Sequence, residues 1–82
     1  MNTMPCQIYI ERIDASKNMK RFYIVSLSET LLSEVCVARR WGRIGTRGQE
    51  KLHYFARELD ALEFLLGLLN GKRKRGYSLK RR

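Results

Sequence analysis

The sequence has few of the residues on which disulfide-rich and metal-binding proteins depend, with one histidine and two cysteines among 82 residues. Cys6 and Cys36 lie far apart in the chain, and each falls within an apolar, strand-like run. We expect buried thiols, and a single disulfide between the two stays open. Neither cysteine has the second nearby thiol or histidine that a zinc site needs, so no metal is predicted.

Catalytic groups are equally scarce. His53, the one histidine, lies in a predicted strand with no serine or cysteine partner that the sequence reveals. The acidic residues are scattered, and those near the start of the predicted helix are explained by its dipole. We therefore predict a protein that is not an enzyme and that needs no cofactor.

Long apolar runs are also missing. The longest, Phe64 to Leu69, includes Gly67 and is far too short to span a bilayer. The N-terminus lacks a cationic segment followed by an apolar stretch, so a soluble, intracellular protein is expected. Membrane binding through an amphipathic helix is not favoured, because the predicted sheet needs the apolar face of that helix.

Positive charge is abundant. The 17 Lys and Arg against 8 Asp and Glu give a formal charge of +9, which favours a polyanionic partner and nucleic acid above all. Net charge alone does not separate specific recognition from a merely soluble basic protein. The chain is short enough to hold one domain only, since such a chain buries only about 60% of its unfolded surface.

Apolar periodicity predicts an α+β fold. Alternation indicates strands at four places, namely Cys6 to Ile13, Phe22 to Leu27, Val35 to Trp41 and Gln49 to Phe55. From about Glu58 the period becomes helical, and eight apolar residues up to Leu69 predict a helix with a wide buried face. Gly76 suits a left-handed position just after the end of this helix, and Gly71 is an alternative position at which the helix could end.

These elements predict an antiparallel β-sheet of about four to five strands, with one long α-helix from the C-terminal half packed on it. Residues 1–77 are expected to form the single domain. Residues 78–82 are expected to form a basic, disordered tail, because chain ends rich in charge usually fray.

Gly42, Gly45 and Gly48 recur at intervals of three, which is typical of a tight hairpin with residues at positive φ. A Walker phosphate loop is excluded, because Gln49 and a strand follow where Lys-Ser or Lys-Thr and a helix belong. The GxxG spacing also fits a KH loop, but that loop joins two helices. Trp41 and several arginines beside this hairpin suit nucleic acid, although a core Trp with solvated arginines is at least as good a reading.

The run from Arg39 to Gln49, RRWGRIGTRGQ, closely resembles the defining motif of WGR domains. Three further features are similar and in the same order. They are Asn18-Met19 with Arg21-Phe22-Tyr23, the helix, and the closing segment from Lys72 to Tyr77. The resemblance runs from roughly Ile8 to Tyr77 and is greatest to the stand-alone bacterial form, which implies the cytoplasm of a bacterium, with association with the nucleoid left open.

In eukaryotes this domain sits inside poly(ADP-ribose) polymerases, where it helps to engage DNA breaks and relays that engagement to a separate catalytic region. By resemblance, Trp41 packs on the sugar of a terminal nucleotide, and Arg43 joins contacts to DNA and to other domains. Lys72 and Lys74 match basic positions near the helix end that approach phosphate. A lone domain lacks the partners that sharpen recognition of breaks in the polymerases.

We therefore predict a non-enzymatic nucleic-acid-binding module, with DNA favoured over RNA and with ends or breaks as a further option. In this reading Trp41 stacks, Arg43 and Arg47 hold the backbone, and Lys72, Lys74 and Arg39 add phosphate contacts. The alternative is a protein-interaction adaptor, in which the same hairpin docks on an acidic partner and nucleic-acid affinity is non-specific.

Overall fold

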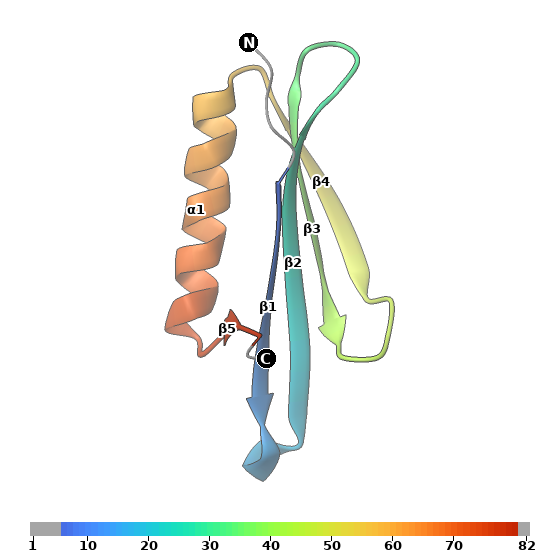
Figure 1. The fold of residues 1–82 in the computed structure, drawn as a ribbon, viewed down its shortest axis with the longest axis vertical. Coiled ribbons are helices and arrows are strands. Elements are labelled where there is room, and N and C mark those ends of the chain that lie inside the picture. The colour runs from blue at the N-terminus through green and yellow to red at the C-terminus, as the bar shows by residue number, and fades with distance from the viewer. Residues whose placement is uncertain (1–5, 81–82) are drawn as a thin grey trace.

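The computed structural model describes residues 6–80, which form one antiparallel sheet with a single α-helix against one face (Figure 1). The elements in chain order are β1 (Cys6–Asp14), the 3-10 helix η1 (Ala15–Lys17), β2 (Met19–Glu29), β3 (Val35–Arg43), β4 (Gln49–Phe55), α1 (Glu58–Lys74) and β5 (Ser78–Leu79). The strands lie in the order β4-β3-β2-β1-β5. The predicted α+β class is confirmed.

The first four strands form a meander, in which each strand pairs with the next along the chain. β5 then returns to the outer edge of β1, where Leu79 lies opposite Ile10 and Ser78 opposite Glu11. The structure here differs from the expected tail, because two residues of 78–82 join the sheet. Gly76, at φ +97°, reverses the chain after α1 and brings it to a strand edge that is otherwise unpaired. Residues 81–82 of that expected tail lie outside the described residues.

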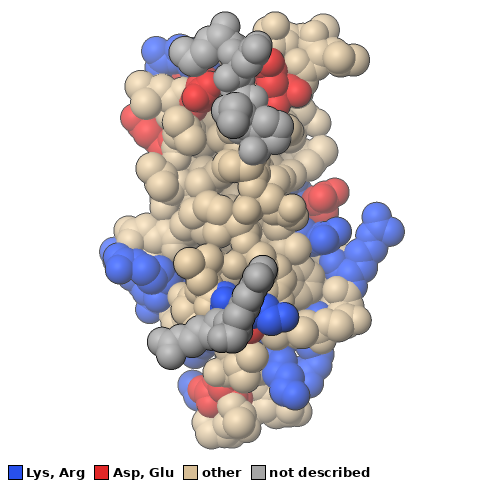
Figure 2. Space-filling model, in the orientation of Figure 1, with Lys and Arg blue, Asp and Glu red and all other residues tan. Residues whose placement is uncertain are grey.

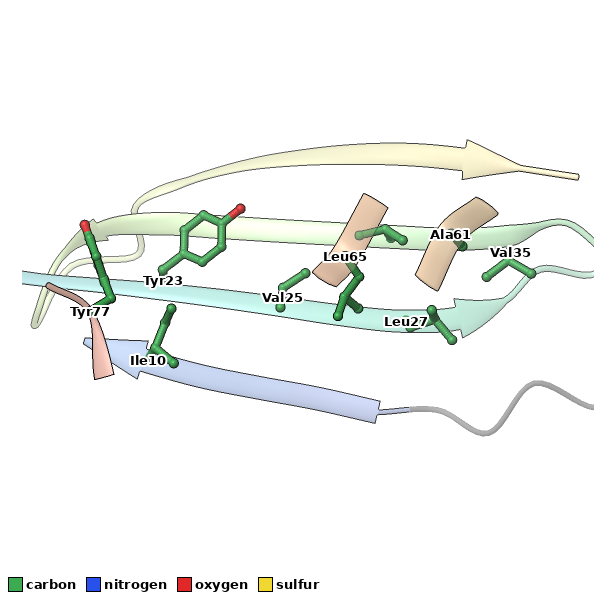
Figure 3. Packing of buried hydrophobic residues seen from close by; sticks show 9 residues of the cluster. Ile10, Tyr23, Val25, Leu27, Val35, Ala61, Leu65 and Tyr77 are labelled. Carbon is green, nitrogen blue, oxygen red and sulfur yellow. The ribbon is translucent and has the colours of Figure 1, made fainter. Parts of the chain in front are cut away.

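The core lies between α1 and the face of the sheet that it covers (Figure 3). Tyr23 and Val25 alternate along β2 toward the helix, and Val37 does the same on β3, all three fully buried. Ala61 and Leu65 meet them from α1. The alternation of apolar residues along the strands therefore identified the helix-covered face of the sheet.

The buried face of the helix is narrower than expected, although Leu62, Phe64, Leu68 and Leu69 are partly buried and also pack against the core. Only Ala61 and Leu65 of α1 are fully buried, whereas Leu59 and Leu66 are 60% and 61% exposed. One helix against one sheet has a single neighbouring layer, so it buries only the stripe that faces that layer. The helix end is as predicted, with Gly76 in the left-handed conformation.

The two cysteines are free and differ in environment. Cys36 is buried on β3 as expected, but the prediction of a buried Cys6 is wrong, because Cys6 begins β1 beyond the part of the strand that β5 covers and is exposed. Cys6 lies opposite Leu27 and Cys36 opposite Ser28, so the two side chains belong to opposite faces of the sheet. In residues 6–80 no helix is both long and apolar enough to cross a bilayer.

Candidate nucleic-acid interface

A pocket of about 580 Å³ opens where the β1–β2 connection, the end of β3 and the last turn of α1 meet. We call it the basic pocket. Its lining residues are Lys17, Asn18, Met19, Lys20, Arg21, Trp41, Gly42, Arg43, Lys72 and Tyr77. Five of these residues are Lys or Arg and none is acidic, so the pocket concentrates positive charge beside two aromatic rings. Lys and Arg also gather mainly over this half of the molecule, away from the β2–β3 connection (Figure 2).

Strand register brings these residues together. Arg43 lies directly opposite Arg21, and Trp41 lies opposite Tyr23, in the antiparallel pairing of β2 with β3. Residues two apart on a strand share a face, so the four side chains form two neighbouring pairs on the helix-covered side. Lys72, near the end of α1, reaches the same place.

Trp41 is half-buried and packs against the core while also lining the basic pocket. The guanidinium carbon of Arg39 lies 4.9 Å from the indole centroid. Arg39 is held there by a second contact, because its Nε donates a hydrogen bond of 3.1 Å to Nε2 of His53. Burial and the neighbouring charges of Arg39 and Lys51 lower the pKa of His53, which keeps the imidazole neutral and able to accept this bond.

Arg43 ends β3 and is exposed. Its Nη1 donates a hydrogen bond of 3.3 Å to the backbone carbonyl of Asn18. Asn18 has a left-handed conformation at φ 49°, because it ends η1 and turns the chain into β2. This contact holds the Arg43 side chain beside the β1–β2 connection, which also lines the basic pocket, and leaves guanidinium donors free for an anion.

Lys72 lies over two tyrosine rings, with its Nζ 4.7 Å from the centroid of Tyr23 and 5.2 Å from that of Tyr77. Burial lowers the pKa of Lys72, and the positive charges of Arg75, Arg39 and Arg21 lower it further. A bound anion would relieve this repulsion. A cation held near like charges in a pocket is a feature of functional sites.

The glycine-rich connection after β3 is compact for two physical reasons. Gly45 and Gly48 have positive φ, whereas Gly42 is needed for close approach, since a Cβ there would lie 2.8 Å from Cα of Gly48. Thr46 closes the turn, because its backbone N–H and its hydroxyl both donate to the carbonyl of Arg43, at 3.0 Å and 2.7 Å. The connection thereby fixes the end of β3, where Arg43 stands.

The structure brings some of the predicted site residues together and separates others. Trp41, Gly42, Arg43 and Lys72 line the basic pocket, and Arg39 contacts Trp41. Arg47 and Lys74 are exposed and do not line it.

Sequence reasoning missed six residues of the pocket, namely Lys17, Asn18, Met19, Lys20, Arg21 and Tyr77. Lys17, Lys20 and Arg21 are visible in the sequence as basic residues just before the predicted strand from Phe22. The position of Arg21 opposite Arg43 depends on strand register, which required the fold. Within the described part of the chain, no three His, Cys, Asp or Glu side chains are grouped to hold a metal ion.

Comparison with known proteins gives two informative relatives. The chain is 48% identical over 77 residues to an uncharacterized protein, y4dW, of Sinorhizobium fredii, with 94% of this chain and 38% of that protein covered. It is 35% identical over 72 residues to poly [ADP-ribose] polymerase 2-A of Oryza sativa subsp. japonica, covering 84% of this chain and 11% of the polymerase. The chain thus spans well under half the length of either relative. No solved structure matches it significantly.

A family model provides the broadest match. The model described as the WGR domain matches residues 6–82, which includes every element of the fold and the whole basic pocket. The protein therefore belongs to the WGR domain family, whose members are binding domains rather than catalytic ones.

Proposed function

We propose that this domain binds DNA through the basic pocket, without catalysing a reaction. The observation that carries the proposal is the composition of the pocket, which combines five cationic side chains, two aromatic rings and no carboxylate. Phosphate oxygens match the Lys and Arg donors, and the exposed part of Trp41 offers a flat apolar surface to a sugar or base.

Each principal contact has its own role in this proposal. Trp41, fixed by Arg39, packs on a nucleotide, and Arg43 and Lys72 bind phosphate from the two sides of the pocket. Arg47, Lys74 and the other exposed cations add longer-range attraction, because they lie outside the pocket on the same strongly basic protein. The relative from rice is a poly [ADP-ribose] polymerase, which is consistent with a nucleic-acid ligand.

The finer proposal is a preference for free DNA ends. A pocket accommodates a terminal sugar and phosphate more readily than a continuous duplex, in which the next base pair and the next sugar-phosphate unit occupy the space beyond each nucleotide. Trp41 is the only tryptophan in the chain, so its fluorescence reports directly on the pocket.

The experiment titrates the protein with a blunt, 5′-phosphorylated duplex and with a closed-end duplex of equal length, near physiological salt. Tighter binding to the open duplex, with a change in Trp41 emission, supports end binding in the pocket. Equal affinity with silent Trp41 emission contradicts it and leaves only attraction between a basic protein and a polyanion. Single-stranded RNA of matched charge serves as the comparison for the choice of DNA over RNA.

A second candidate function is a protein-interaction adaptor. It is favoured by the fact that similar segments occur within proteins much longer than this chain. In this case Arg43 would meet an acidic protein surface, and DNA affinity would depend on total charge alone. Trp41→Ala separates the two functions, because it changes the pocket while leaving every charge in place.

A further inference from the structure

A rigid, apolar tip closes the β2–β3 hairpin at one end of the molecule (Figure 1). We call residues 29–34 the leucine tip. Leu31 and Leu32 are 104% and 81% exposed there, the highest values among the large apolar residues that the structure describes. Neither leucine belongs to the core, so folding of the single chain does not explain why two adjacent leucines stand at this position.

Hydrogen bonds hold the leucine tip in one conformation. The hydroxyl of Thr30 accepts from the backbone N–H groups of Leu32 and Glu34, each at 3.2 Å. The Thr30 N–H donates to the Glu34 carbonyl at 2.8 Å, and Ser33, with φ 63°, donates to the Thr30 carbonyl at 3.1 Å. A tip ordered before binding loses little conformational entropy when it docks.

An apolar groove of about 740 Å³ is lined in part by β5, which lies well away from the β2–β3 connection (Figure 1). Its lining residues are Ile8, Ile10, Leu69, Arg73, Tyr77, Ser78, Leu79 and Lys80. The groove stays open because β5 pairs only with Ile10 and Glu11. Most of its lining is apolar, and its charged residues, Arg73 and Lys80, are both positive.

The charges of the two surfaces are complementary. Residues 25–38 contain no Lys or Arg in a chain of net charge +9, and the acidic residues in this stretch are Glu29 and Glu34, one on each side of the exposed leucines. The tip therefore pairs two leucines with negative charge, and the groove pairs an apolar lining with positive charge. The tip does not fill the groove within one copy, because no residue of 29–34 lines it.

We infer that the leucine tip of one copy docks in the apolar groove of a second copy. Leu31 and Leu32 enter the groove and pack on its apolar lining, which includes Ile10 and Leu79, and the flanking glutamates face Arg73 and Lys80. The contact joins different surfaces of the two copies, so it is heterologous. Its small area makes it a weak, concentration-dependent association of the kind that forms and dissociates readily.

Sedimentation equilibrium of the full chain without DNA tests this contact, over concentrations up to about 1 mM. The weight-average mass of the wild type should rise from 9.7 kDa toward at least twice that value. Leu31→Ser with Leu32→Ser removes the tip, and Leu79→Glu places a negative charge in the groove. Each variant alone should stay at the mass of the monomer, and Leu66→Ser, which changes an exposed helix leucine outside both surfaces, should associate like the wild type.

The decisive sample is an equimolar mixture of the tip variant and the groove variant. One has an intact groove and the other an intact tip, so the mixture should regain association that neither variant shows alone. A wild type that remains monomeric, variants that associate as the wild type does, or a mixture that stays monomeric would each overturn the inference. Circular dichroism of every variant checks that the fold is intact, and all of the substituted leucines are exposed.

Discussion

Arg39 lies across the indole of Trp41, two residues further along β3, and reaches from there to His53 on β4. The arrangement joins three side chains from two strands on the same face of the sheet. Because His53 accepts the hydrogen bond and Arg39 contacts the ring, the orientation of Trp41 is set before any ligand arrives. A preorganised aromatic ring loses little entropy on binding.

Trp41→Ala should weaken binding to an open duplex by about 1–3 kcal/mol, because the stacking surface is lost while the charge is unchanged. Trp41→Phe should lose less, since part of that surface remains. Tyr54→Ala is the matched control, because Tyr54 is an exposed aromatic residue on β4 outside the basic pocket. Fluorescence anisotropy of labelled DNA measures all three. Equal affinities for wild type and Trp41→Ala would contradict the proposed role of Trp41.

Arg43→Gln and Lys72→Gln should each reduce the salt dependence of binding. For duplex DNA, the log-log slope falls by about 0.9 for each phosphate contact removed. Lys74→Gln removes the same charge from a residue outside the pocket and should change the slope less. Titrations at several salt concentrations give the slopes. If all three substitutions reduce the salt slope equally, binding depends on the total charge of the protein and not on the pocket.

Gly48→Ala should destabilise the domain by about 2 kcal/mol or more, because Gly48 has φ +76° and a Cβ there would collide with the backbone carbonyl of Trp41. Gly67→Ala is the opposite case, since no atom outside the helix lies within 4 Å of its Cβ position in the middle of α1. It should stabilise the domain by about 0.5–1 kcal/mol. Urea unfolding measures both. A stable Gly48→Ala variant would show that the connection after β3 can relax.

Stability should fall with acid in a way that depends on His53. Burial, together with Arg39 and Lys51, lowers the pKa of His53 below its ordinary value of 6.5. The unfolded chain therefore binds this proton more readily, so the stabilisation is complete above about pH 6.5 and is lost as pH falls through the lowered pKa. His53→Gln keeps an acceptor for Arg39 but does not titrate. Its stability should change less than that of the wild type between about pH 7.5 and pH 5.5 in urea unfolding.

The sequence by itself determined the elements and the class of the fold. Alternating apolar residues locate the four long strands, and the change to helical period near Glu58 locates α1. Gly76 marks the end of that helix because few other residues adopt its conformation. These features follow from local backbone preferences, which neighbouring residues in the chain decide.

Only the tertiary structure decided which residues become neighbours and which become buried. Arg21 and Arg43 are far apart in the chain, and the register of β2 with β3 makes them neighbours in the basic pocket. Leu59 and Leu66 fit the apolar pattern of α1 yet remain exposed, because the sheet offers the helix only one face. β5 forms because the outer edge of β1 lies beside it, although Ser78 and Leu79 carry no strand pattern of their own. Burial and register depend on which surfaces meet in space, and local sequence does not contain that information.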